Sequence, residues 1–442
     1  MKRLFLILVT LHASLVTLYA QKFEEHFDGR TLRLDYIFAG DSVSQHIFFH
    51  QAYSMPQWAG RRSRLAEKYL NGNGQITLRD HATQEILYIS TFSTLFQEWQ
   101  ATDEAKHVQR SFPASYLVPM PRRLADVCVT LTDFHNRTTA QLTHTIDPSD
   151  ILIRPLAETG IPHRYLLQNG DATECVDLAI LAEGYTEAEM PKFYADAQRA
   201  VEAIFSHEPF MSMKQRFNVV AVASPSHDSG PCIPHAGQWK QTACGSHYDT
   251  FYTDRYLMTS EIHRIYDLLA DVPFEHIIVM VNSSTYGGGG IYNQITLSTS
   301  DHSTFKQVLV HEFGHAYGGL GDEYDYGDDM ANMYNAETEP WEPNLTTLVD
   351  FDSKWADLLP EGTPIPTPKA DIPNFRYAHT AEEWAQINAA TQHVGVFEGG
   401  GYQTRGVYRP AQECRMKINE VEHFCPVCDR AIRRITDFYT AQ

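Results

Sequence analysis

The chain has 442 residues, of which 43% are hydrophobic and 20% are charged, and its formal net charge is −20. This composition is ordinary for a globular protein and excludes a disordered, collagen-like or coiled-coil chain. The length allows two or three domains. The acidic balance disfavours nucleic acid as a partner, because a negative surface repels phosphate backbones.

Residues 1–20 have the pattern of a secretory signal peptide. Lys2 and Arg3 precede an apolar run over residues 4–18, and Ala20 supplies a small residue before the expected cleavage site. The run is too short and too polar to span a membrane, and no later segment is apolar enough to do so. We therefore expect an exported protein without a membrane span, located in the periplasm, at the cell surface or outside the cell.

Short β-rich segments separated by turn signals fill residues 21–170. Residues 75–79 alternate after the turn sequence at 71–74, and residues 85–90 and 127–132 are also β-rich. This pattern predicts an antiparallel β-sandwich. Because this part of the chain lacks a catalytic constellation, we expect an accessory domain here.

Strands and helices alternate in the remainder of the chain, which indicates a second domain over residues 171–442 with an α/β layer architecture. The expected elements are a strand at 176–181, a helix from a capping box at 186–189 to about residue 205, a strand at 217–222, a helix at 258–269 and a strand at 277–281. The whole chain is therefore predicted to be α+β.

The glycine run at residues 287–290 lacks the Gly-Lys-Ser/Thr ending of a phosphate-binding loop. We expect these glycines to form a tight, mobile loop beside a strand at 291–297. Residues 293–297 fit two descriptions equally well. They are either an ordinary inner strand or a sheet edge that pairs with an extended peptide.

The strongest chemical signal is the HExxH sequence at residues 311–315. His311 and His315 are four residues apart, so on a helix both imidazoles can reach one metal ion. Glu312 lies between them and can take a proton from a water on the metal. Zinc suits this set, because it binds imidazole and carboxylate and keeps one position open in catalytic sites. A capping box of Thr304 and Gln307 and a stop at residues 318–319 predict the helix.

The third metal ligand is expected after the helix end. In the metzincin pattern HExxHxxGxxH, Gly318 matches the glycine, but the ligand position is Gly321, which has no side chain. Counting from Gly319 instead gives Asp322, which we prefer to its neighbour Glu323. Neighbouring side chains of an extended segment point to opposite sides, so only one of the two should face the metal.

A gluzincin-type ligand is the remaining alternative for the third position, and Glu337 is its best candidate. Met416 resembles the methionine of a Met-turn, which lies beneath the metal site in metzincins. Three acidic residues follow the motif, at 325, 328 and 329, and calcium is a conceivable ligand for them. We favour a solvated acidic loop there over a calcium site.

Seven cysteines are present, so at least one would stay unpaired in an oxidising compartment. Cys232 and Cys244 lie in a loop-like stretch and are a plausible disulfide. Cys425 and Cys428 form a CxxC pair, for which a redox motif, half of a zinc site and a structural disulfide involving Cys414 stay open. We favour the disulfide, because the redox motif lacks a βαβ context and the zinc site lacks a second CxxC.

The second half of the chain resembles the IgA-cleaving type of bacterial secreted metallopeptidase. The similar segments are HEFGHAYGGLGDEY at 311–324, AEGYT at 182–186, EPNLT at 342–346, FEGGGY at 397–402, GVYRP at 406–410 and the stretch from Cys414 to FCPVC at 424–428. The resemblance spans about residues 176–435. It implies a metzincin-like zincin catalytic domain behind the N-terminal β-sandwich, and it leaves the substrate open.

These observations favour a secreted zinc endopeptidase that acts on protein or peptide substrates, among which host immunoglobulins and glycoproteins are candidates. Zinc exopeptidases and deglycosylating hydrolases are alternatives that keep the metal chemistry. A binding protein with an inactive site is the alternative from another class. The intact Glu312 disfavours that last alternative, because a zincin that has lost its activity typically loses this residue first.

Overall fold

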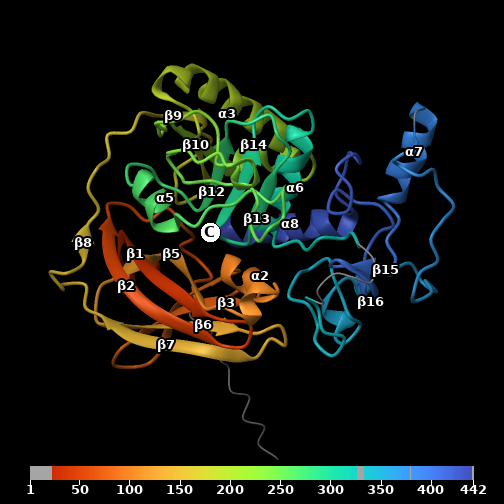
Figure 1. The fold of residues 1–442 in the computed structure, drawn as a ribbon. Coiled ribbons are helices and arrows are strands. Elements are labelled where there is room, and N and C mark those ends of the chain that lie inside the picture. The colour runs from red at the N-terminus through yellow and green to blue at the C-terminus, as the bar shows by residue number, and fades with distance from the viewer. Residues whose placement is uncertain (1–21, 326–332, 379, 441–442) are drawn as a thin grey trace, which may run out of the picture.

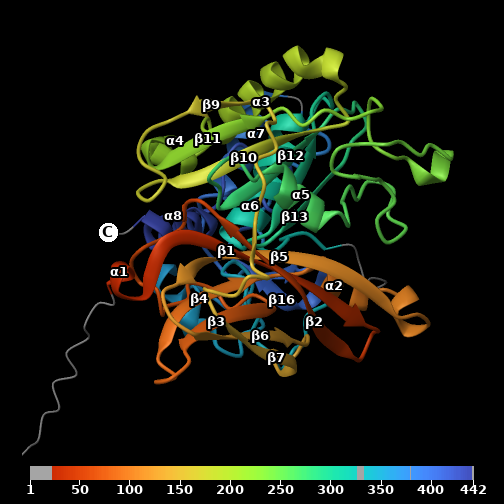
Figure 2. The same cartoon turned by 90° about the vertical axis from the view of Figure 1, so that its left-hand side faces the viewer.

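The computed structural model describes residues 22–325, 333–378 and 380–440. The predicted signal peptide lies outside these residues, as do Asp328 and Asp329 of the acidic loop. The described chain forms an N-terminal β-rich unit and a mixed α and β unit, which lie against each other (Figures 1 and 2). Within the described residues, none of the helices is both long and apolar enough to cross a membrane.

Two four-stranded sheets build the N-terminal unit. One has the order β5-β1-β2-β8 and the other β4-β3-β6-β7, and all pairs are antiparallel except β2 with β8. Buried side chains of both sheets share one hydrophobic core. The strands are β1 Phe27–Gly40, β2 Gln45–Met55, β3 Gly74–Asp80, β4 Ile86–Phe92, β5 Arg110–Pro121, β6 Ala125–Thr132, β7 Thr138–Ile146 and β8 Arg154–Pro155, with the short helices α1 Phe23–His26 and α2 Leu95–Gln100.

A six-stranded sheet forms the centre of the second unit, in the order β13-β14-β12-β10-β11-β9. Its inner strands are parallel and entirely buried, because the sheet is covered on both faces. The strands are β9 His163–Leu167, β10 Val176–Glu183, β11 Phe217–Val222, β12 His276–Val281, β13 Gly288–Ile291 and β14 Ile295–Thr299. Strand β9 falls in the range expected for the first domain, but it pairs with β11 at the edge of this second sheet.

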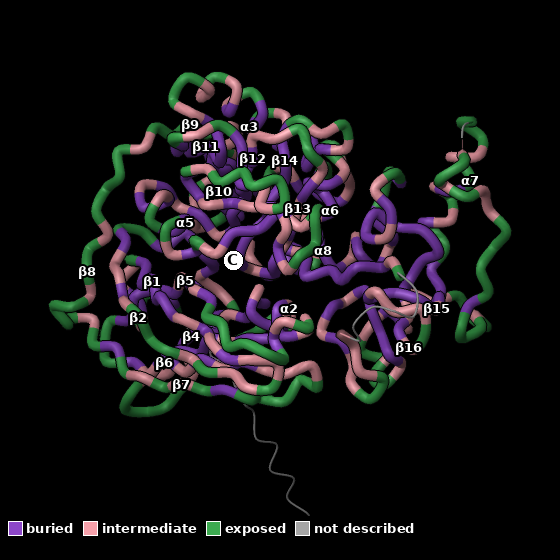
Figure 3. Tube along the Cα trace, in the orientation of Figure 1, coloured by how far each residue is buried: buried purple, intermediate pink, exposed green. Residues whose placement is uncertain are grey.

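Helices cover the sheet on both sides. Side chains of α3 Met190–Ile204, α4 Phe210–Met213, α6 Phe305–Gly318 and α8 Pro426–Thr440 share a core with one face of β10. Helix α5 Ile262–Leu268 packs on the other face, which is turned toward the N-terminal unit. Helix α7 Ala381–Ala390 and the hairpin of β15 Phe397–Gly400 and β16 Gln403–Arg409 lie to one side in Figure 1. Figure 3 shows exposed and intermediate residues along α7, whereas the sheet is mostly buried.

The glycine run is a strand and not the mobile loop that we expected. Gly290 and Gly288 lie in β13, which packs directly against α6. A Cβ atom on Gly290 would lie 2.3 Å from the carbonyl oxygen of Glu312, so a larger residue would force the strand away from the helix. The absence of side chains therefore serves close packing, which is a second use of glycine besides turn formation.

Of the two descriptions left open for residues 293–297, the structure confirms the inner strand. Strand β14 lies between β13 and β12, so residues 295–299 form an inner strand. The edge strand is β13, and an isolated bridge joins its Gly288 to Tyr256 on the outer side. The predicted helix at 258–269 begins later, at Ile262, because residues 256–258 are used in these extended contacts.

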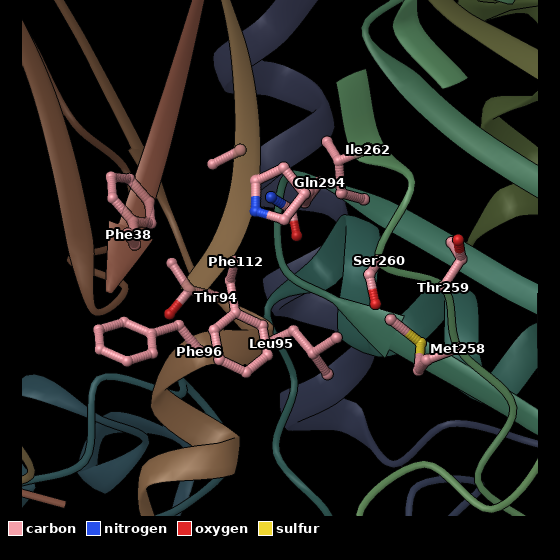
Figure 4. Close-up of a pocket in the computed structure, with 12 residues that line it drawn as sticks. Phe38, Thr94, Leu95, Phe96, Phe112, Met258, Thr259, Ser260, Ile262 and Gln294 are labelled. Carbon is pink, nitrogen blue, oxygen red and sulfur yellow. The ribbon is translucent and has the colours of Figure 1, made fainter. Parts of the chain in front are cut away.

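Hydrogen bonds and an ion pair join the two units. Arg33 Nη1 of β1 lies 2.6 Å from Asp267 Oδ1 of α5, and the backbone N–H of Tyr292 donates to Ser93 Oγ at 2.9 Å. A cavity of about 10 Å³ remains between α2, β5 and residues 258–262 (Figure 4). It has room for about one water molecule, and its lining residues include no metal-binding side chain, so we regard it as a packing gap.

Candidate active site

Helix α6 carries both histidines of the HExxH sequence. The helix begins at Phe305 after Thr304, whose side chain makes no capping hydrogen bond, so the predicted capping box with Gln307 is wrong. Thr304 Oγ1 lies instead 2.8 Å from Nδ1 of His302. The helix ends at Gly319, whose φ of +63° is the left-handed conformation that glycine adopts without steric cost.

Two backbone carbonyls orient the imidazoles. His311 Nδ1 donates to the carbonyl oxygen of Arg415 at 3.0 Å, and His315 Nδ1 donates to that of Leu320 at 2.6 Å. Both Nε2 atoms are therefore unprotonated in the neutral rings and free to bind a metal. They lie 3.0 Å apart.

Asp322 completes this group. Its Oδ1 lies 3.1 Å from Nε2 of His311 and 3.2 Å from Nε2 of His315. The turn at Gly319 brings the chain back over the helix end, and Asn344 fixes this loop by accepting from Gly321 N–H at 2.7 Å and donating to Gly321 O at 2.9 Å. The structure thus brings together His311, His315 and Asp322.

The other two candidates for the third position lie elsewhere. Glu323 is fully buried, but its carboxylate points away from the histidines and toward Cys428. Glu337 is exposed, and its N–H donates to Asn335 Oδ1 on the surface. The side chains of Asp322 and Glu323 therefore face opposite sides, as expected for neighbours in an extended segment.

The electrostatics of the group are those of a cation site. Burial opposes ionisation of Asp322, yet the two imidazoles hold the pKa of this carboxyl well below its ordinary value. Burial lowers the pKa of His315, but the Asp322 carboxylate outweighs it and raises that pKa to about 10. A carboxylate next to two imidazoles thus demands a positive charge, which either a proton or a metal ion supplies.

The spacing of the donor atoms fits zinc. Zinc–nitrogen bonds of about 2.0–2.1 Å place neighbouring ligand atoms of a tetrahedral site about 3.3 Å apart. The three donor atoms here are separated by 3.0–3.2 Å. Three protein ligands leave one position for water or substrate, which is the arrangement of a catalytic zinc site.

Glu312 lies on α6 between the two histidines and faces strand β13. A Cβ atom on Gly288 would lie 2.9 Å from Glu312 Oε1, so the glycine provides the space for this carboxylate. Burial raises the pKa of Glu312, and the neighbouring histidines act in the opposite direction. The carboxylate therefore lies near the two histidines but outside the group of His311, His315 and Asp322, which is where a general base would be expected.

Met416 lies beneath α6. Its side chain is fully buried, and its Sδ would lie 2.8 Å from a Cβ atom on Gly314, in the turn between the two histidines. We expect Met416→Leu to lower the free energy of unfolding by less than ~1.5 kcal/mol while peptide turnover hardly changes, because the buried side chain of Met416 packs beneath the helix and is not exposed to bind a substrate. Chemical denaturation and a peptide assay measure the two effects. Met211→Leu, at a position 51% exposed, is the control, and a large loss of turnover with intact stability would contradict this role.

Tyr402 is a site residue that the motif analysis missed. It follows β15 with a φ of +67°, and its hydroxyl donates to Asp322 Oδ2 at 2.5 Å. Tyr402 and Asn344 both lie in segments that resemble the metallopeptidases, FEGGGY and EPNLT, which was the available signal. Their roles depend on distant contacts that no local pattern reveals.

We expect Tyr402→Phe to raise the Kd for the metal about 10–100-fold, because the hydroxyl of Tyr402 orients the Asp322 carboxylate through a hydrogen bond. Competition with a chelator of known affinity measures this change. Tyr377→Phe, at an exposed position, is the matched control and should leave the Kd unchanged. An unaltered Kd for Tyr402→Phe would show that Asp322 is held by other contacts.

The disulfide expected between Cys232 and Cys244 is not formed. All seven cysteines lie in the described part of the chain, and none of them is in a disulfide there. The thiol of Cys232 instead accepts from the backbone N–H of Lys240 at 3.2 Å. The N–H of Cys244 donates to the buried Glu183 carboxylate at 2.6 Å, which fixes this end of the loop separately. The disulfide expected for the CxxC segment and Cys414 is likewise absent.

Comparison with known proteins identifies the chain. The family model described as IgA Peptidase M64 matches residues 165–389 and 374–436, and the model described as Peptidase M64 N-terminus matches residues 22–143. Among curated proteins, none matches the sequence. Since the first model spans more than half of the chain, the protein belongs to the IgA peptidase M64 family and is a metallopeptidase.

Proposed function

We propose that this protein is an exported zinc endopeptidase of metzincin-like fold, in which His311, His315 and Asp322 bind the ion and Glu312 is the general base. The observation that carries the proposal is the approach of the three donor atoms to within 3.2 Å of one another, with Glu312 close enough for its carboxyl to interact electrostatically with all three residues. The glycine turn and the methionine beneath the helix support the comparison with metzincins.

Zinc, when bound, polarises a carbonyl and lowers the pKa of a water molecule toward neutrality. Glu312 accepts the proton of the attacking water and returns it to the amine that leaves when the peptide bond breaks. Tyr402 and the carbonyls of Arg415 and Leu320 hold the ligands in place through the hydrogen bonds described above.

Digestion of casein by the purified protein, with and without a chelator, tests the activity. We expect internal cleavage that stops on chelation and returns when zinc is added. Mass spectrometry of the products separates an endopeptidase, which cuts within the chain, from an exopeptidase, which shortens it from one end. If casein stayed intact at every zinc concentration although metal analysis showed zinc bound to the protein, the binding-protein alternative would be favoured.

For the physiological substrate we propose host immunoglobulins or other glycoproteins, which the name of the family supports. Incubation with purified IgA, followed by analysis of the heavy-chain fragments, tests this class. Export is supported by the sequence pattern of the first 20 residues, and fractionation of the producing cell into cytoplasm, envelope and medium tests it.

A further inference from the structure

A second group of metal-binding side chains lies behind the loop that carries Asp322. It consists of Glu323, Cys414, Cys425 and Cys428, all of which are 0% exposed. Their sulfur atoms and one carboxylate oxygen all lie within 4.8 Å of one another. None of these four residues takes part in the catalytic chemistry proposed above.

The spacing of the sulfurs differs from that of a disulfide. The Sγ atoms of Cys414 and Cys428 are 3.9 Å apart, whereas a disulfide bond is about 2.05 Å long. Zinc–sulfur bonds of about 2.3 Å place two thiolates of a tetrahedral site about 3.8 Å apart. Cys428 Sγ also lies 3.1 Å from Glu323 Oε1, which makes the carboxylate part of the same cluster.

Pairing two of the cysteines would leave this cluster incomplete. The third thiol would remain unbonded, and the buried Glu323 carboxylate would have no cation in direct contact among the ion pairs of the described residues. Asn344 donates to Glu323 Oε1 at 2.9 Å, but Oε2 is buried and has no hydrogen-bond partner among the residues that the structure describes. A buried carboxylate oxygen without a partner destabilises the folded protein. A cation bound by the four residues would balance the charge of this carboxylate and of the thiolates.

A buried guanidinium lies near the same cluster. Arg409 is 1% exposed and donates to the backbone carbonyls of Ala411, Gln412, Glu398 and Gly399. Burial lowers the pKa of Arg409, and the charges of Glu323 and Cys414 act in the opposite direction. Arg409 therefore offsets part of the negative charge that three thiolates and a carboxylate around a divalent ion would leave.

We propose that Glu323, Cys414, Cys425 and Cys428 bind a second metal ion, zinc by preference, in a closed structural site. Thiolates select zinc over the harder cations calcium and magnesium. Four protein ligands leave no open position, which is characteristic of structural zinc.

This second site would hold the first one together. Glu323 directly follows Asp322, and its backbone N–H donates to the carbonyl oxygen of Met416 at 2.8 Å. Cys414 directly precedes Arg415, whose carbonyl orients His311. An ion bound by residues 323 and 414 therefore ties the loop of the third catalytic ligand to the segment beneath the catalytic helix.

Metal analysis of the full-length protein tests the proposal. We expect two zinc ions per chain in the wild type, one in H311A/H315A, and at most one in C425S/C428S, in which the catalytic site also loses the support of the second ion. C175S, which changes a buried cysteine outside the cluster, is the matched control and should keep two. In the cobalt-loaded protein, a thiolate-to-cobalt charge-transfer band should persist in H311A/H315A and be absent from C425S/C428S.

The test does not depend on the cysteine variant folding. One ion per wild-type chain, together with no charge-transfer band in the cobalt-loaded H311A/H315A variant, would overturn the proposal. So would a disulfide between any two of the three cysteines, detected by peptide mapping after alkylation of the denatured, unreduced protein. Failure of the catalytic proposal is distinguishable, because H311A/H315A would then hold as many ions as the wild type while its cobalt-loaded form still showed the charge-transfer band.

Discussion

Glu312→Gln is expected to lower kcat for peptide hydrolysis by about 10²–10⁴-fold while the metal content stays that of the wild type. Glutamine has the size of glutamate, so it fits beside Gly288, and neither histidine is altered. Its amide cannot accept the proton of the attacking water. Turnover of a fluorogenic peptide and metal analysis of the same preparation measure the two quantities.

Glu337→Gln is the matched control, because Glu337 is an exposed glutamate that makes no contact with the catalytic group. It should have wild-type activity. Wild-type turnover by Glu312→Gln would remove Glu312 from the mechanism. A loss of metal in that variant would instead assign the carboxylate to binding.

Asp322→Ala is expected to abolish both peptide hydrolysis and stoichiometric binding of the catalytic ion. It removes one of the three proposed ligands, so the loss of affinity should exceed the 10–100-fold that follows removal of a side chain that only hydrogen-bonds to a ligand. Asp325→Ala, three residues farther along at an exposed position, is the control and should keep the ion. Calorimetric titration of zinc into the metal-free protein measures the affinities.

A comparison with Glu323→Ala tests the register of this loop. That variant should keep His311, His315 and Asp322 around the catalytic ion, although it weakens the support of the loop. If Asp322→Ala hydrolysed peptides at the wild-type rate and Glu323→Ala did not, the third ligand would be Glu323.

The sequence was most informative where chemistry depends on local spacing. His311, Glu312 and His315 lie within one helical stretch, so their common placement follows from helix geometry alone. The position of Asp322 followed from one further local fact, the turn at Gly319. The alternation of side chains in an extended segment then separated Asp322 from Glu323, and the two carboxylates do face opposite sides.

The wrong predictions concerned glycines and cysteines, because each of these residue types serves two different structural purposes. Glycine permits tight turns and also close packing, and Gly288 and Gly290 serve the second purpose in β13. Cysteines predict disulfides in an exported chain, but they also bind metals. The cluster around Cys428 includes Glu323, which is distant in the sequence, so spacing within the CxxC segment could not reveal it.

The contacts between the N-terminal unit and the second unit could not be predicted from the sequence, because they join residues that are far apart in the chain. The side chain of Leu70 would lie 2.4 Å from a Cβ atom on Gly319, the residue at the turn before Asp322. Asn293 Nδ2 donates to the carbonyl oxygen of Thr91 at 2.7 Å, beside the strand that follows the glycine run. The N-terminal unit therefore forms part of the wall behind the catalytic helix.

This packing bears on what a proteolytic cut between the two units would do. The connection over residues 147–162 is largely exposed, with Ile151 at 93% and Leu152 at 71%, so it is the natural place for such a cut. The fragments would stay associated, because the ion pair of Arg33 with Asp267 and the contacts of Leu70 do not depend on chain continuity. The nicked protein should elute from a sizing column as one species and keep its activity. That result would make the N-terminal unit a permanent subunit of the enzyme, whereas dissociation of the fragments would make it a removable pro-segment.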